Sequence, residues 1–439
     1  MTAVSGREPG HAGAPGTTGT PGTTGATSTT KTPSAAETIA WAAGQAGVVL
    51  PVRVRAWDGS EGGPAAAPAI VLRSPRALRR ILWRPGELGL ARAYVSGDLD
   101  VDGDLTEALR RARRAFGAGR AGLAPMQWTK AVSGAALAAR RLGVFGPPPP
   151  PPDCEIRHSG RPHSRARDKA VIAGHYDLPV AFYRLILDAS MAYSCGYWTS
   201  DAPDYGLADA QRDKLDLVAS KLGLGPGRSL LDLGCGWGSL TVHAGQHWQA
   251  HVTAVTLSVE QGGYTRERLR GLGVGDRAEV LTQDYRDAPA GPFDAIASLE
   301  MGEHVGAAGY PAFCAALRGR LRPGGRVLIQ QMSRRGRAPG GGAFIESYVA
   351  ADMHMRPVGE TVGLLERAGL EVMSVEALRP HYVRTIRAWL ANLERNFAEV
   401  TDMLGEERAR LWRLYLAGGA LAFEEGRMGV DQILATRRE

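Results

Sequence analysis

The sequence is short of the features that stabilise secreted and membrane-spanning proteins. Its 439 residues include only four cysteines, which are far apart and form no C-x-x-C pair: Cys154, Cys195, Cys235 and Cys314. This spacing gives neither a zinc site nor a disulfide framework, and it fits a reducing cytoplasm. No apolar run reaches the roughly 18 residues that a membrane-spanning helix needs. The N-terminus also lacks the basic start and apolar core of a signal peptide. We therefore expect a cytoplasmic protein without a metal site, at most peripheral to a membrane.

Positive charge is in modest excess, with 52 Lys and Arg against 45 Asp and Glu and a formal net charge of +7. Such an excess favours anionic partners, either nucleic acid or a membrane surface. Much of it is arginine between residues 73 and 141, as in RSPRALRRILWR and RRARRAFGAGR. A solvated helix face explains such runs as well as a binding surface does, so composition leaves both interpretations open.

The first 168 residues divide into three parts. Residues 1–36 are mostly Gly, Thr, Pro, Ala and Ser, a composition that predicts disorder. Residues 37–145 form a smaller α+β domain, in which VRVRAW alternates like a strand. In the same domain SPRALRRILW predicts a helix with Ser74 as N-cap and Pro75 at its first position. Residues 146–168 predict a linker, because a run of prolines favours a stiff polyproline II spacer and the basic stretch after it is typical of a mobile segment.

From residue 169 to residue 439 the pattern changes. Apolar runs of strand length alternate with helical stretches: SLLDLG, HVTAVTL, AEVLTQ, FDAIAS and GRVLIQQ. This alternation predicts an α/β domain with a doubly wound, mostly parallel, Rossmann-like sheet and helices on both faces.

A Gly-rich turn follows the first of these strands, in LLDLGCGWG at 230–238. Gly234 and Gly236 permit a tight turn and the close approach of a ligand, and Gly238 is placed to open a helix. The G-x-G-x-G form, with Asp232 just before it, is typical of S-adenosylmethionine (SAM) methyltransferases rather than of the dinucleotide G-x-G-x-x-G turn. The next strand ends in TLSVEQ, without the acid that binds ribose hydroxyls in NAD enzymes and in most methyltransferases.

The stretch SLEMGEHVG, residues 298–306, places two acids and a histidine at the end of another strand: Glu300, Glu303 and His304. In one interpretation, these charged side chains simply lie in a solvent-exposed loop. In the other, an acid at the carboxyl end of a parallel strand faces a ligand.

Several stretches together resemble the cyclopropane fatty acid and mycolic acid synthases. They are HYDLPVAFYRLILDASMAYSCGYW, LLDLGCGWG, VTLSVEQ, QDYRD, SLEMGEHVG, HYVRTIRAW and YLAGGALAFEEGRMGVDQIL, and they cover most of residues 169–439. ELGLARAYVSGDLDVDGDL resembles part of the extra N-terminal domain found in the members that act on phospholipids. The resemblance implies a SAM-dependent transfer of one carbon to the cis double bond of an unsaturated phospholipid acyl chain. The methylated carbocation then loses a proton from the new methyl group and closes a cyclopropane ring. Aromatic faces stabilise the cation, and a bound bicarbonate is the base.

The resemblance also assigns roles to individual residues. Glu303 matches the catalytic glutamate, Tyr382 matches a tyrosine that helps to hold bicarbonate, and Cys195 would supply a backbone contact. Contacts with SAM fall on nine residues of several segments: Tyr193, Ser194, Asp232, Gly234, Gly236, Thr256, Leu257 and Gln261, with Tyr285 beside the adenine. Helical spacing places Tyr382, Thr385 and Trp389 on one face, and we expect only Tyr382 to line the site.

Two positions depart from the family pattern. Gln330, in LIQQM, stands where the family has a bicarbonate-binding histidine, and a glutamine can donate a hydrogen bond but cannot become cationic. Gly419 replaces a cysteine that some members carry. These changes leave the base and the product open. Cyclopropane is the first expectation. An exocyclic methylene, expected where the proton leaves a chain carbon instead, is the alternative, as in relatives that make 10-methylene fatty acids.

Three other functions compete with this interpretation. A nucleic-acid methyltransferase of the amino-methylating kind would carry a D/N-P-P-Y/F turn where SLEMGEH stands, so we expect no nucleic-acid partner. A small-molecule methyltransferase and a non-catalytic lipid-binding protein are the other two. We expect peripheral contact with an anionic membrane through the N-terminal domain, and the sequence leaves a homodimer open.

Overall fold

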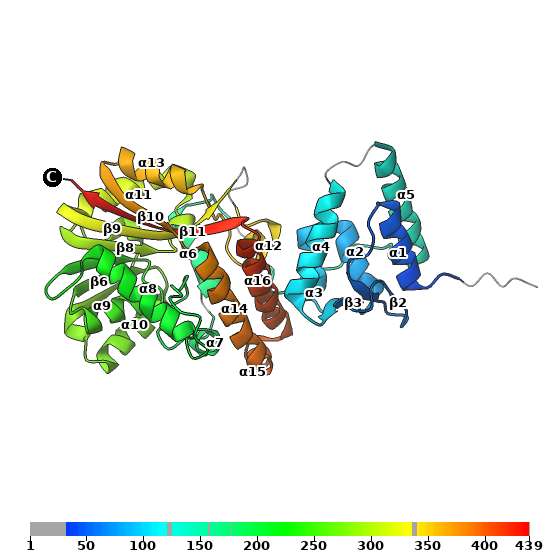
Figure 1. The fold of residues 1–439 in the computed structure, drawn as a ribbon, viewed down its shortest axis with the longest axis horizontal. Coiled ribbons are helices and arrows are strands. Elements are labelled where there is room, and N and C mark those ends of the chain that lie inside the picture. The colour runs from blue at the N-terminus through cyan, green and yellow to red at the C-terminus, as the bar shows by residue number, and fades with distance from the viewer. Residues whose placement is uncertain (1–31, 121–124, 157–158, 177, 336–339, 439) are drawn as a thin grey trace, which may run out of the picture.

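The computed structural model describes residues 32–120, 125–156, 159–176, 178–335 and 340–438. In Figure 1 a smaller N-terminal part, in blue and cyan, lies at one end of an elongated molecule, and the larger part with the main sheet lies at the other. The disorder predicted for the first 36 residues falls mostly outside the described residues. Its boundary is corrected, because Ala35 and Ala36 are buried in a helix that Ser34 caps.

The N-terminal part is a four-stranded sheet with helices, as the sequence predicts. The sheet has the order β2-β1-β3-β4. The elements are α1 Ala35–Gln45, β1 Arg53–Arg55, β2 Glu61–Gly62, β3 Ala69–Leu72, α2 Pro75–Trp83, α3 Glu87–Val95, β4 Leu99–Asp102, α4 Leu105–Arg120 and α5 Pro125–Arg141. The Ser74 hydroxyl accepts a hydrogen bond from the Arg76 amide, and Pro75 begins α2, so the predicted cap is confirmed.

The stretch after α5 is not the free linker that the sequence suggested. The Pro150 carbonyl accepts a hydrogen bond from Arg80. Glu155 pairs with Arg92 of α3 and accepts a hydrogen bond from Tyr348 in the larger part. Contacts at Pro150 and Glu155 therefore fasten the stretch to the two parts of the molecule. Helix α6, Arg165–Tyr176, begins before the predicted boundary at 169.

The larger part is built on a seven-stranded sheet with the order β10-β11-β9-β8-β5-β6-β7. The strands are β5 Ser229–Leu233, β6 His251–Thr256, β7 Ala278–Thr282, β8 Phe293–Leu299, β9 Leu321–Arg334, β10 Leu370–Ala377 and β11 Met428–Arg437. The first five are mutually parallel, and β11 runs antiparallel to both of its neighbours. The predicted doubly wound, mostly parallel sheet is confirmed.

Alternation along the strands sends neighbouring side chains into two separate cores. Leu230 packs into the core that contains Leu215 of α8, whereas Leu231 packs into the core that contains Phe313 of α11. The helices of this part are α7 Val180–Ile186, α8 Leu207–Leu222, α9 Ser239–His247, α10 Val259–Gly271, α11 Gly306–Arg320, α12 Ala343–Tyr348, α13 Val358–Arg367, α14 Arg379–Arg395, α15 Phe397–Leu404 and α16 Glu406–Glu424. Three short 3-10 helices are η1 Gly275–Arg277, η2 Tyr285–Asp287 and η3 Gly302–His304.

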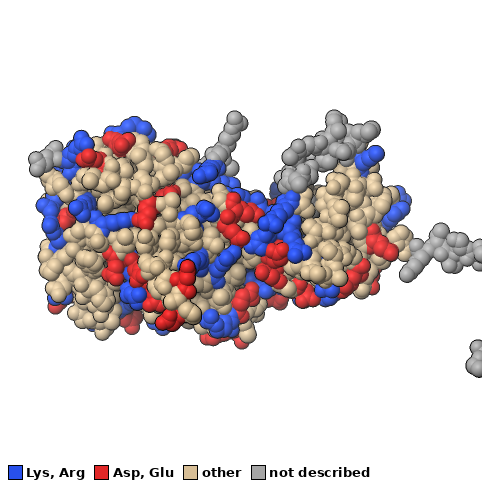
Figure 2. All heavy atoms as spheres, in the orientation of Figure 1, with Lys and Arg blue, Asp and Glu red and all other residues tan. Residues whose placement is uncertain are grey.

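Helix α16 joins the two parts. Its buried Arg410 donates to the Tyr94 and Leu99 carbonyls of the N-terminal part, at 2.7 Å each. On this face of the molecule basic side chains gather near the junction (Figure 2), where Arg110 of α4 pairs with Glu424. Part of the arginine excess therefore serves contacts within the chain. Among the described residues, every helix is too short or too polar to cross a membrane.

Candidate active site

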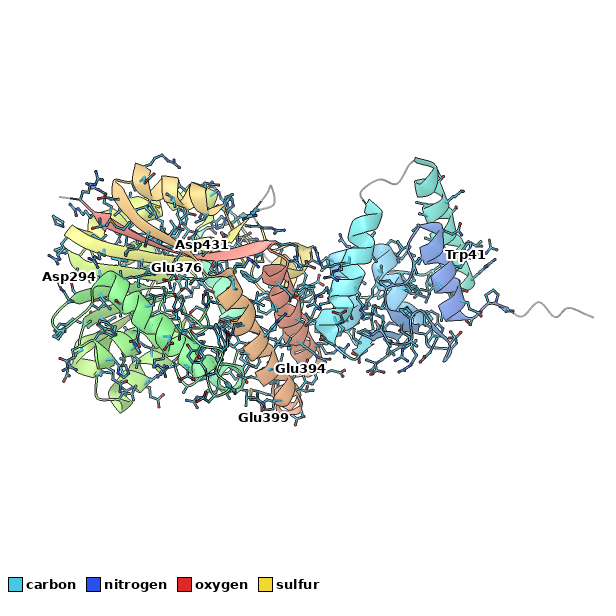
Figure 3. All side chains as sticks on the ribbon, in the orientation of Figure 1. Trp41, Asp294, Glu376, Glu394, Glu399 and Asp431 are labelled. Atoms are coloured by element: carbon cyan, nitrogen blue, oxygen red, sulfur yellow. The ribbon has the colours of Figure 1, made fainter. Side chains whose placement is uncertain are left out.

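The site lies at the carboxyl ends of β5 and β8, where the sheet changes its winding direction. From β5 the chain continues to β6 on one side, and β8 pairs with β5 on the other. Ligands of open α/β sheets bind in the crevice at such a point. At the opposite ends of the same two strands, their amino ends, the polar contacts stabilise the sheet. Asp294, labelled at the far left of Figure 3, accepts a hydrogen bond from the Ser229 amide at 2.9 Å and pairs with Arg228.

All nine residues that the sequence assigned to the cofactor line one cavity. They come from the carboxyl ends of β5 and β6, from the segments that follow β5, β6 and β7, and from the segment before α8: Tyr193, Ser194, Asp232, Gly234, Gly236, Thr256, Leu257, Gln261 and Tyr285. Glu300, Met301 and His304, which follow β8, complete the wall. The fold thus gathers segments that are distant in sequence, and their contacts with SAM stay a prediction.

Different constraints favour glycine at Gly238 and at Gly236 of the turn. Gly238 is the N-cap of α9, as expected, and a Cβ there would lie 2.4 Å from Cγ2 of Thr265. Gly236 lines the cavity with φ +54°, and a Cβ there would meet nothing within 4 Å. Its bare backbone therefore borders open space in which a ligand can approach closely, which is the fit that a SAM turn requires.

Two polar contacts shape the cofactor side of the cavity. Asp232 is buried and accepts a hydrogen bond from the Thr241 hydroxyl at 2.7 Å, and burial raises its pKa to about 6. The Thr256 hydroxyl donates to Oε1 of Gln261 at 2.8 Å, which leaves the Gln261 NH2 group as a donor. A glutamine thus stands near the position from which the usual ribose-binding acid is absent.

Glu300, rather than the expected Glu303, is at the centre of the polar network. Its Oε1 accepts hydrogen bonds from the Cys195 amide at 2.7 Å and from Nε2 of Gln330 at 2.9 Å. Its Oε2 accepts one from the Tyr382 hydroxyl at 2.5 Å. Three residues assigned to bicarbonate from the sequence therefore contact one carboxylate of the chain itself.

Glu303 lies in a different environment. It is fully buried on η3, its Oε1 accepts a long hydrogen bond of 3.3 Å from the Met332 amide, and its Oε2 has no partner among the described residues. Burial, and after it the nearby Glu300, raise the pKa of Glu303 to about 8. Glu300 lines the cavity and Glu303 does not. The catalytic role that the sequence assigned to Glu303 therefore stays a prediction.

Two residues of α8 support the site without any sequence signal. Lys214 is fully buried, and its Nζ donates to the Ser194 hydroxyl at 2.9 Å. Gln211 donates to the Ser194 carbonyl at 2.8 Å. Burial lowers the pKa of Lys214, and the charge of Glu300 opposes that effect. In QRDKLDLV both residues resemble part of a solvated helix face, so only the tertiary structure identifies them.

Aromatic rings form an apolar wall behind Tyr193, which itself lines the cavity. Tyr193 packs against Trp389, with 5.1 Å between ring centroids, and against Trp412 at 6.1 Å. The edge of Tyr382 meets Trp389. The predicted helix face is present, since Tyr382, Thr385 and Trp389 are all buried on α14. Tyr382 does not itself line the cavity and contacts the site through its hydrogen bond to Glu300. Such rings suit a site in which a cation develops.

The strand order, the glycine turn after the first strand of the parallel sheet and the cavity beside it define the chain as a SAM-dependent methyltransferase. The family described as mycolic acid cyclopropane synthetase matches residues 163–433, and the chain belongs to that family.

Curated relatives match both parts of the chain. A probable fatty acid methyltransferase from Pseudomonas putida is 36% identical over 88% of this chain and 92% of its own. A probable fatty acid methyltransferase from Mycobacterium tuberculosis is 34% identical over 88% and 91%. The tuberculostearic acid methyltransferase UfaA1 of the same organism is 31% identical over 87% of each chain.

Solved structures match the larger part. The cyclopropane synthase MmaA2 from Mycobacterium tuberculosis has a TM-score of 0.58 and 28% identity, covering 62% of this chain and 98% of its own. The mycolic acid cyclopropane synthase CmaA1, complexed with SAH and CTAB, has a TM-score of 0.58 and 29% identity over 61% and 98%. The N-terminal part therefore has a counterpart in the curated relatives and lies beyond these two structures.

Proposed function

We propose that this methyltransferase transfers the methyl group of SAM to the cis double bond of an unsaturated phospholipid acyl chain. The observation that carries the proposal is the single cavity in which the nine predicted cofactor residues meet a carboxylate and lie beside an aromatic wall. The names of the relatives, which refer to fatty acids and to cyclopropane formation, support an acyl substrate.

Each group of residues has a task in this reaction. Bound SAM supplies an electrophilic methyl group. Gly234 and Gly236 bring the backbone close to it. The rings around Tyr193 exclude water and present faces that stabilise a cation on the acyl chain. The carboxylate at the end of β8 is available for a proton.

The product depends on the fate of the cation that methylation leaves on the acyl chain. Loss of a proton from the new methyl group, with closure onto the neighbouring cation, gives cyclopropane. A methylene branch requires that a hydride first move from the methylated carbon to the adjacent cation, after which the methyl group loses the proton. Loss from a chain carbon gives an internal alkene, so the route to methylene expected from the sequence is corrected here.

We favour the branched product as the outcome. Two relatives that span both parts of the chain are named fatty acid methyltransferases and a third is named a tuberculostearic acid methyltransferase. The two cyclopropane synthase structures match the larger part alone, at 28% and 29% identity. Cyclopropane remains the second candidate, supported by the family that matches residues 163–433.

The test is an assay of the purified enzyme with SAM and vesicles of a cis-monounsaturated phospholipid. We expect acyl chains heavier by one CH2 in mass spectrometry of the methyl esters. Proton NMR then separates exocyclic methylene protons from cyclopropane ring protons. A SAM-binding enzyme that modifies no acyl chain would contradict the proposal and favour a small-molecule substrate.

Membrane contact is part of the same proposal, at the inner face of the cytoplasmic membrane. Apolar side chains near the end of α2 and after α5 are exposed: Leu82 by 44%, Trp83 by 51% and Phe145 by 57%. The two segments are adjacent, because the Trp83 indole donates to the Gly146 carbonyl at 2.9 Å. Arg84 is exposed beside them. Apolar and cationic side chains together suit an anionic lipid surface.

A further inference from the structure

The backbone at Glu300 is unusual. Its φ is +54°, a left-handed conformation that non-glycine residues seldom adopt. It comes directly after β8, and its amide donates to the Gln330 carbonyl at 2.5 Å. This conformation directs the side chain to the cavity wall, beside the Gly234 turn that Met301 contacts. Backbone strain of this kind persists where surrounding contacts hold it, often at functional sites.

The neighbouring amides are oriented as donors toward Glu300. Lys221 can only donate, and its Nζ lies 2.7 Å from Oε1 of Gln432. Nε2 of Gln432 must then face Oε1 of Gln330, at 2.9 Å. The Gln330 NH2 group is left to face Glu300. A lysine on α8 thus fixes the direction of two glutamines and presents a donor to the carboxylate.

The donors leave part of the carboxylate open. An ionised carboxylate has about four acceptor positions, and the Cys195 amide, the Gln330 amide and the Tyr382 hydroxyl fill three of them. The fourth is on Oε2, and Glu300 is only partly buried because it borders the cavity.

We infer that the Glu300 carboxylate itself accepts the proton that the methylated acyl chain loses, in place of a bound bicarbonate. The inference rests on the proposed function and adds the identity of the base. The groups expected to hold bicarbonate already donate to Glu300. A second anion would compete for these donors and would meet the negative charge of Glu300 at close range.

The step balances without another reactant. The acyl double bond gives its electron pair to the methyl carbon, and the electrons of the broken carbon–sulfur bond remain on sulfur. Glu300 takes a proton from the resulting cation. The released C–H pair becomes the third side of a cyclopropane or, after a hydride shift, the second bond of a methylene group. The protonated Glu300 later returns its proton to solvent.

The charges around Glu300 suit a base. Burial raises the pKa of Glu300, and its three hydrogen-bond donors and the buried Lys214 of α8 oppose this effect. Glu303 on η3, with a pKa of about 8, is mostly neutral at pH 7. Burial also raises the pKa of Tyr382 on α14 and of the Cys195 thiol, so both stay protonated. The hydrogen-bond donors around Glu300 and the charge of Lys214 thus favour the ionised form that a base requires.

The first experiment removes bicarbonate. The wild-type enzyme is assayed with SAM and monounsaturated phospholipid in buffer stripped of carbon dioxide, with and without added bicarbonate. We expect equal rates. A rate that vanishes in stripped buffer and returns with bicarbonate would overturn the inference. A wild-type enzyme that is inactive on lipid in both buffers would contradict the proposed function instead, so the two failures are distinguishable.

The second experiment changes the base. Glu300→Gln keeps the shape and removes the proton acceptor, and we expect kcat to fall by about 10²- to 10⁴-fold with SAM affinity retained in calorimetry. The control is Asp431→Asn, a buried carboxylate that accepts a hydrogen bond from Ser333 on the neighbouring strand and lies outside the cavity wall. We expect the control to keep its rate. An unchanged rate in Glu300→Gln would refute the inference.

A third variant separates a base from a merely structural carboxylate. Glu300→Gly suits the positive φ and leaves the three donors free around an empty space. We expect its activity to be lost and then partly restored by formate or bicarbonate in a concentration-dependent way, with no rescue of Glu300→Gln, whose amide fills the space. A folded, SAM-binding Glu300→Gly that no small anion restores would assign Glu300 a structural role only.

Discussion

Residues 300 and 303 show how burial differentiates two glutamates of one short stretch. Glu300 receives three donors and borders the cavity. Glu303 receives one weak hydrogen bond and is fully buried. Because desolvation disfavours the charged form of a carboxyl group, ionisation costs more free energy at the fully buried Glu303.

We predict that Glu303 makes the protein less stable as pH rises. Its pKa is 4.5 when unperturbed and about 8 in the fold. Between these values the folded state binds a proton that the unfolded state has lost, so the free energy of unfolding decreases with rising pH. Glu303→Gln should flatten this slope in urea unfolding at several pH values between 5 and 8. Glu399→Gln, which changes an exposed residue of α15 (Figure 3), is the control and should change this slope much less. Equal slopes for Glu303→Gln and wild type would contradict the prediction.

A substitution at Gly236 tests whether the glycine turn binds the cofactor. Gly236→Val adds a branched side chain in the open space of the cavity, at a φ of +54° that disfavours it by about 1–2 kcal/mol. We expect SAM binding to be abolished in calorimetry. Gly263→Val is the matched control, because a Cβ there also meets nothing within 4 Å and the residue is exposed on α10, outside the cavity wall. Wild-type SAM affinity in Gly236→Val would mean that the cofactor binds elsewhere.

Among the elements, β9 and β11 matter most for the site. They pair so that Gln330 is opposite Gln432, and the Lys221 side chain of α8 reaches Gln432 from the end of its helix. The antiparallel strand thus connects a partly buried lysine to the carboxylate at the end of β8.

We predict that the direction of this amide chain sets the acidity of Glu300. Gln432→Glu accepts from Lys221 but offers no donor to Gln330, so the Gln330 amide should turn and present its oxygen to Glu300. The pKa of Glu300 should rise further, and the acid limb of the kcat profile should move to higher pH. Gln432→Met, which merely removes the contact, should move it less. The measurement is kcat against pH for the three proteins, and superimposable profiles would exclude this positioning role.

At the scale of the whole molecule, the N-terminal part offers the surface that meets lipid. We predict that Leu82→Ser combined with Phe145→Ser weakens sedimentation with anionic vesicles at low and high salt, because apolar contact is not screened. Arg84→Glu should weaken it by on the order of 2 kcal/mol at low salt and much less at high salt. Val259→Ser, which changes an exposed apolar residue of α10 in the larger part, is the control. Unaltered sedimentation of the N-terminal variants would locate membrane contact elsewhere or remove it.

The order of the elements could be predicted from the sequence for a physical reason. Strands that are buried on both faces must be apolar runs, so SLLDLG and FDAIAS can be recognised as strands from the local sequence alone. A helix cap needs a particular residue type at one position, so Ser74 can be recognised in the same way. The family resemblance named nine cofactor residues, and all nine line one cavity, although their contacts with SAM stay a prediction. The contacts of Pro150 and Glu155 could not be predicted, since they depend on partners such as Arg92 and Tyr348 that are distant in sequence.

The sequence by itself determined the class of fold, the methyltransferase turn and the presence of an acid after β8. Only the tertiary structure decided which acid meets the donors. Glu300 and Glu303 are three residues apart, and the left-handed backbone at Glu300 sends its side chain to the cavity while η3 buries Glu303. Cys195, Gln330 and Tyr382 converge on that carboxylate from 105, 30 and 82 residues away. No local pattern records such a convergence, because it arises from packing between elements rather than from the propensity of any one of them.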